Sequence, residues 1–96
     1  MPQLQIRPKT ATNLTTLIKS AVENQMFLID FGIAKTKRKL KEFEKEFGMN
    51  SSTFYKKFNE GQLGDDFKYV RWAGEYETLE QLQKDYNDLK DLELFS

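Results

Sequence analysis

The feature that most constrains this chain is a break in its helical pattern within the stretch from Gly48 to Gly74. On both sides of the break, apolar residues recur every three or four positions, which is the spacing of an amphipathic helix. Both prolines, Pro2 and Pro8, precede these two stretches, so neither stretch contains the residue that most disfavours a helix. The pattern predicts an all-α fold: a long helix, a short connector helix and an antiparallel C-terminal helix that together form a coiled-coil-like hairpin.

The stretch before the break carries one continuous stripe, with Thr12 or Asn13 available to cap its helix. Its members lie three or four residues apart, and one of them is polar: Ile18, Val22, Met26, Ile29, Ile33, Thr36, Leu40, Phe43 and Phe47. Gly32 lies beside this stripe and has no turn residues around it. We therefore expect one uninterrupted helix, in which Gly32 permits the close approach of another helix.

The break itself contains the residues that end and begin helices. Gly48 suits the left-handed position that closes a helix, and Asn50 to Ser52 offer oxygens that cap the next one, from about Thr53 to Asn59. Asp65 or Asp66 can cap the last helix. The predicted elements are an N-terminal arm over 1–11, a single helical domain over 12–96, and within it a helix over 12–47, a connector over 48–65 and a helix over 66–92.

Aromatic residues are concentrated around this break, which we call the elbow. Five apolar residues are predicted to form its core: Phe54, Phe58, Leu63, Phe67 and Trp72. A platform that presents the same aromatics to a partner is the alternative interpretation. We favour the core, because buried aromatics dominate the energetics of a small domain.

Composition argues against catalysis. The chain has no cysteine and no histidine, so thiolate chemistry and the commonest general base and metal ligand are absent. Glycines 61 and 64 do not form a phosphate-binding pattern, and capping explains the Asp65–Asp66 pair more simply than a metal does. We expect no enzyme activity, no cofactor and no metal site. Without a membrane-length apolar run or a signal-peptide pattern, the expected location is the cytoplasm, with no membrane partner.

Charge is unevenly distributed along a chain of zero net charge. Residues 1–47 hold nine basic and five acidic residues, a net charge of +4, and residues 48–96 hold six basic and ten acidic residues, a net charge of −4. The two halves can attract each other, or they can attract a polyanion and a basic protein separately. The basic run over 35–46 allows contact with nucleic acid, but its aromatics lie on the apolar stripe rather than among the lysines, so this support is weak.

Residues 14–33 are apolar over an arc too wide for one partner helix, and Leu14, Leu17 and Leu28 belong to it. The candidate interface residues within the arc are Ile18, Val22, Met26, Phe27, Ile29 and Phe31. Because the last helix is shorter than the first, we expect part of this arc to stay uncovered in one chain. A second copy would bury it, so the sequence predicts a homodimer or higher oligomer.

The stretch from residue 42 to 94 resembles a family of short archaeal and cyanobacterial proteins with a helix ending in FE-x-x-[YF]-GM-S, an F-x-x-KF-x-x-G-x-LGDD linker and a W-x-G-[EL]-YE helix. The matching positions are Phe43, Glu44, Phe47, Gly48, Met49, Phe54, Lys57, Phe58, Gly61, Leu63, Gly64, Asp65, Asp66, Trp72, Gly74, Tyr76 and Glu77. Asn50 stands where the family has Ser, and Lys68 and Arg71 stand where the family tends to carry acids.

Members of that family are often encoded beside a small toxin-like protein and are regarded as antitoxins. The resemblance implies a non-catalytic module that neutralises a cognate toxin by protein–protein contact. Two alternatives remain at this point: a DNA-binding autorepressor, in which Leu4 to Arg7 of two chains pair as a ribbon, and a structural coiled-coil adaptor.

Overall fold

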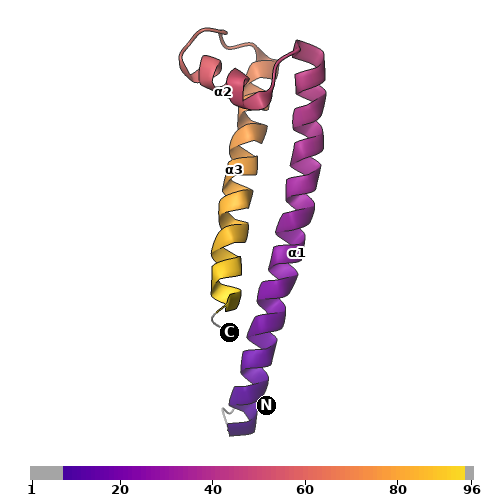
Figure 1. Ribbon diagram of the computed structural model, residues 1–96, viewed down its shortest axis with the longest axis vertical. Coiled ribbons are helices and arrows are strands. Elements are labelled where there is room, and N and C mark those ends of the chain that lie inside the picture. The colour runs from indigo at the N-terminus through magenta and orange to yellow at the C-terminus, as the bar shows by residue number, and fades with distance from the viewer. Residues whose placement is uncertain (1–7, 95–96) are drawn as a thin grey trace, which may run out of the picture.

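The computed structural model describes the backbone of residues 8–94 and the side chains of residues 13–93. The elements are α1 (Pro8–Phe47), α2 (Ser51–Asn59) and α3 (Phe67–Leu94), and the described chain contains no strand. Helices α1 and α3 lie side by side and antiparallel, and α2 packs across the end where they are joined (Figure 1). The predicted all-α hairpin is confirmed.

The molecule is a rod, with extents of 60 × 30 × 22 Å. The longest extent is the length of α1, since 40 residues at about 1.5 Å each span about 60 Å. Helix α3 has 28 residues, so the first turns of α1 extend beyond the C-terminal end of α3 (Figure 1). The last helix thus leaves part of the first uncovered.

Four helix boundaries differ from the prediction. Helix α1 begins at Pro8, so the expected arm is wrong over residues 8–11; proline is favoured in the first turn of a helix, where its missing N–H costs nothing. Helix α2 begins at Ser51 rather than Thr53, because Asn50 is the N-cap. Helix α3 runs from Phe67 to Leu94 instead of over 66–92. The proposed strand over 4–7 lies outside the described residues.

Local hydrogen bonds account for these ends. Gly48 has a φ of 65° and its N–H donates to the Glu44 carbonyl at 2.8 Å, which closes α1. The Asn50 Oδ1 accepts the N–H of Thr53 at 2.8 Å, and the Asp66 Oδ1 accepts the N–H of Lys68 at 2.8 Å. Side-chain oxygens thus cap α2 and α3 as expected for Asn and Asp.

Away from the elbow, α1 and α3 are joined by the predicted stripe. Its buried members there are Val22, Met26, Ile29 and Thr36, and the next buried member, Leu40, belongs to the elbow cluster with Phe54 and Trp72. A Cβ at Gly32 would lie 3.4 Å from Leu82 Cδ1 of α3. The absence of a side chain therefore allows α3 to approach closely at this point, as the sequence predicted.

Candidate functional site

The elbow core is built around Trp72, which is completely buried. Its ring stacks on that of Phe54, also completely buried, with centroids 3.8 Å apart and planes 4° from parallel. Phe43 and Phe47 of α1 stack against Trp72 at 5.6 and 5.5 Å. All three helices thus contribute a ring to one stack, and aromatic pairs of this kind stabilise a fold beyond the area they bury.

A chain of polar contacts crosses the same core. The Trp72 Nε1–H donates to Ser51 Oγ at 2.9 Å, and the Ser51 backbone N–H donates to Glu44 Oε2 at 2.8 Å. Ser51 is 4% exposed, so it satisfies a buried indole N–H that water cannot reach. Sequence reasoning missed this connection of α1, α2 and α3; the serine was assigned a capping role, and its pairing with Trp72 depends on how α2 is placed.

The predicted elbow core is right for four of its five residues. Phe54 and Trp72 are fully buried, and Phe58 and Leu63 are half-buried against them. Phe67 is wrong: its side chain is 73% exposed. It precedes Trp72 by five residues, which turns it about 140° around α3 and away from the core. The stacking identifies the elbow aromatics as a structural core rather than a partner platform.

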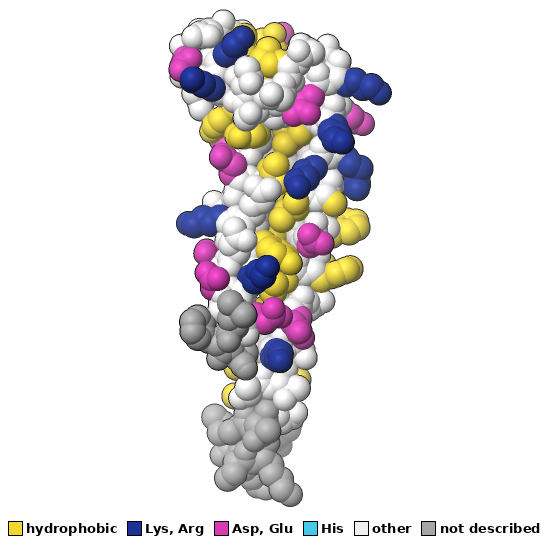
Figure 2. Space-filling model, viewed as in Figure 1, with side chains coloured by type: hydrophobic (Ala, Val, Ile, Leu, Met, Phe, Trp, Pro, Cys, Tyr) yellow, Lys and Arg dark blue, Asp and Glu magenta, His cyan; other side chains and the backbone are white. Residues whose placement is uncertain are grey.

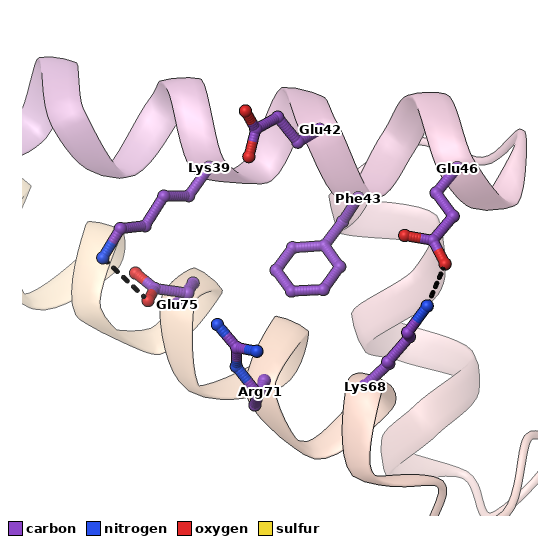
Figure 3. Close-up of a pocket in the computed structure, with 7 residues that line it drawn as sticks. All are labelled: Lys39, Glu42, Phe43, Glu46, Lys68, Arg71 and Glu75. Atoms are coloured by element: carbon purple, nitrogen blue, oxygen red, sulfur yellow. Dashed lines mark hydrogen bonds and ion pairs between the residues drawn. The ribbon is translucent and has the colours of Figure 1, made fainter.

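Beside the elbow, α1 and α3 enclose a shallow hollow of about 300 Å³ whose floor is Phe43 (Figure 3). Two ion pairs cross it, Lys39 to Glu75 at 3.4 Å and Lys68 to Glu46. The other charged groups are Glu42 and Arg71, and the Arg71 guanidinium lies 5.8 Å from the centre of the Phe67 ring. Three cations and three carboxylates balance, so the hollow fits a clasp between the helices better than a site for an ionic ligand.

Two contacts between helices raise the pKa of a side chain. The Glu77 carboxylate accepts the hydroxyl hydrogen bond of Tyr55 at 2.6 Å, and this raises the pKa of the Tyr55 phenol. The hydrogen bond and ion pair with Glu46 raise the pKa of the Lys68 ammonium. Both groups lie near the surface and bind their protons more firmly in the folded chain. They contribute to holding α2 and α1 to α3.

The predicted interface residues divide into two sets. Val22, Met26 and Ile29 are 8%, 9% and 7% exposed, so they are not available to a partner. They face α3, which extends far enough back along α1 to cover them. The large apolar side chains that remain exposed on α1 include three of the predicted residues and three others of the same arc: Leu14, Leu17, Ile18, Phe27, Leu28 and Phe31.

Apart from Phe27, which lies beside Glu23 and Asp30, this exposed set forms a face of α1 that carries no charge. Between residues 13 and 34 the charged residues are Lys19, Glu23 and Asp30, and their spacing of four and seven places all three on one side of the helix. That side is opposite Leu28, about 160° away around the helix. Figure 2 shows hydrophobic side chains projecting from α1 on the side away from α3. We call the exposed set, with the small and polar residues between its members, the uncharged face.

The uncharged face is the strongest candidate for a binding surface. Its two phenylalanines, Phe27 and Phe31, are 67% and 64% exposed, and large exposed apolar patches mark interaction sites. Within residues 8–94 no group of three or more Asp or Glu side chains is placed to hold a metal ion. Among the described helices, none combines the length and the apolar content that crossing a bilayer requires.

Comparison with models of protein families, with curated proteins and with solved structures found no match for this chain.

Proposed function

We propose that this protein is a non-catalytic binding module that neutralises a cognate toxin-like protein in the cytoplasm by protein–protein contact. The observation that carries the proposal is the uncharged face of α1, with Phe27, Leu28 and Phe31 more than half exposed. Exposed aromatics are expensive to leave in water and are the residue type that anchors protein interfaces. The antitoxin-like role is supported by the resemblance of residues 42–94 described above.

The rest of the structure supports a scaffold for that face. The elbow fixes the two long helices against each other through a stack of rings, and two ion pairs cross the hollow beside it. The uncharged face belongs to a helix held along much of its length by α3, so it presents a preformed surface. Binding through such a surface loses little conformational entropy.

Co-expression with the product of the adjacent gene tests the proposal. The expected result is that the tagged protein co-purifies with the product of the adjacent gene, which we call the neighbour. The tagged protein should also restore the growth that is lost when cells express the neighbour without it. Phe27→Glu, which places a charge on the uncharged face, should reduce co-purification at least tenfold and abolish rescue.

Phe67→Glu is the matched control. Phe67 is an equally exposed phenylalanine, but it lies on α3 at the elbow, and a negative charge at the start of a helix is favourable. This variant should bind and rescue like the parent. If neither variant weakens binding, the uncharged face is not the contact surface; if no neighbour is bound or neutralised, the antitoxin-like function is wrong.

A further inference from the structure

The uncharged face contains a second helical seam, separate from the stripe that packs on α3. Its members are spaced 3, 4, 3, 4 and 3 residues apart and all are exposed: Leu14, Leu17, Ala21, Asn24, Leu28 and Phe31. This is the heptad spacing of a coiled coil. The second seam lies about a third of a turn around α1 from the buried stripe, so a helix packed on it would not compete with α3.

The positions that flank the second seam also lack charge. In a coiled coil, the residues that flank the apolar seam determine which helix pairs with it, usually through opposite charges. Here they are Asn13, Ile18, Ser20, Gln25, Phe27 and Ala34, together with Gly32, which faces Leu82 of α3. A strongly charged partner would gain nothing from these flanks and would lose the hydration of its own charges. An identical uncharged seam is a matching partner.

The seam ends where charge begins. Continued at the same spacing, its next two members are Lys35 and Arg38. In a parallel pair of α1 helices, Lys35 would oppose Lys35 and Arg38 would oppose Arg38, which is unfavourable. In an antiparallel pair centred on the seam, the two Lys35 residues lie at opposite ends, about 38 Å apart. Charge therefore selects the antiparallel direction.

We propose that the uncharged face binds a second copy of this chain, with the two α1 helices antiparallel and centred between Ala21 and Asn24. In this register Leu14 packs on Phe31 of the other copy and Leu17 on Leu28, while the small Ala21 meets the polar Asn24 at the middle. A polar residue at one seam position costs stability and fixes register, which is the role this pairing gives to Asn24.

The size of the face fits a modest dimer. Taking 150–250 Å² for a fully exposed aromatic as a guide, the six large exposed side chains present on the order of 600 Å² in each copy. A standard interface buries about 800 Å² per partner, so the small and polar residues of the seam would supply the remainder. The inference rests on the proposed function in one respect, that the uncharged face is a protein interface.

The mass of the isolated protein in solution tests the pairing. At tens of micromolar we expect twice the chain mass of 11.3 kDa by light scattering. Phe31→Glu, at the edge of the seam, should give the monomer mass with unchanged helix content by circular dichroism, whereas Phe67→Glu should remain a dimer. A monomeric parent, or a Phe31→Glu variant that stays dimeric, would overturn the inference.

Disulfide cross-linking tests the direction, and the chain has no cysteine of its own to interfere. Leu17→Cys and Leu28→Cys proteins, carrying different tags, are mixed and oxidised. The antiparallel register brings residue 17 of one copy to residue 28 of the other, so the mixed pair should cross-link. Each variant alone should not, because its own cysteines would lie about 16 Å apart, beyond the reach of a disulfide. Cross-linking of each variant with itself would show a parallel pair and overturn the register.

The two proposals fail in different ways. If Phe31→Glu breaks the dimer but the protein binds no neighbour, the self-association is supported and the antitoxin-like function is rejected. If the protein is a monomer and binds the neighbour through Phe27, the proposed function is supported and the self-association is rejected. A dimer that dissociates when the neighbour is added supports both, with the two partners using one face.

Discussion

Ser51 illustrates how much a single residue decides in this fold. Its backbone N–H is held by Glu44 of α1 and its hydroxyl accepts the indole N–H of Trp72 in α3. A hydroxyl is needed because the indole N–H is buried, and a buried donor without a partner costs about 1–3 kcal/mol. The sequence showed a serine at a helix start, which is common; its partner 21 residues later could not be read from spacing.

Ser51→Ala is therefore expected to lower the free energy of unfolding by about 1–3 kcal/mol, the cost of leaving the Trp72 N–H unpaired. Chemical denaturation followed by tryptophan fluorescence measures this directly. Ser52→Ala is the control: Ser52 is exposed and its hydroxyl bonds to Asn50, so its effect should stay within about 0.5 kcal/mol. Equal effects at both positions would mean that the contact with Trp72 contributes nothing.

At the scale of the elements, the sequence predicted the three helices, their order and the antiparallel hairpin because the apolar spacing and the capping residues agree. What it did not establish was which apolar side chains the neighbouring helices cover. Phe67 was grouped with Trp72 by proximity along the chain, although five residues of helix separate their directions. Val22, Met26 and Ile29 were assigned to an interface because spacing does not show how far back along α1 helix α3 extends. That extent depends on the geometry of the elbow.

Contacts between elements also determine how stability depends on pH. The pKa values of Tyr55 and Lys68 are both raised in the folded chain, by Glu77 and Glu46 respectively. A raised pKa means that the folded state binds the proton more tightly than the unfolded state. The stabilisation is therefore complete below the unfolded values of 10.0 and 10.5 and is lost as the pH rises through the folded values.

We accordingly expect the melting temperature to fall as the pH is raised above about 10. Tyr55→Phe should make that fall shallower, because the variant has no phenolic proton to lose. Glu77→Gln should do the same by removing the charged acceptor. Thermal melts from pH 8 to pH 11 provide the measurement, and a parent-like alkaline fall in both variants would show that the contact between Tyr55 and Glu77 does not contribute.

At the scale of the whole molecule, periodicity predicted the stripe of α1 that meets α3, but Val22, Met26 and Ile29 of that stripe were assigned to the interface as well. The apolar arc of residues 14–33 was treated as one surface, so its covered and its exposed parts were not distinguished. The structure separates them through the positions of Val22 and Phe31, one 8% and the other 64% exposed. Of the predicted interface residues, Ile18, Phe27 and Phe31 thus stay exposed in the chain, and Val22, Met26 and Ile29 are covered.

The rings of the elbow are gathered at one end of a rod 60 Å long, and this asymmetry has a consequence for local opening. Trp72 and Phe54 anchor the first turns of α3, whereas near its other end Leu92 is 52% exposed. Local opening requires less free energy where fewer apolar groups are buried. The hairpin should therefore open first at the C-terminal end of α3, which is the end farthest from the elbow.

Amide hydrogen exchange would record that fraying as a slope: protection in α3 should decline steadily from Trp72 towards Leu92. Uniform protection along α3 would instead mean that the helix opens in a single step. If the slope is present, a binding partner that wedges between the free ends could expose Val22 and Met26 while the elbow stays folded. The buried stripe would then become a second, transient candidate for a binding surface, in addition to the uncharged face.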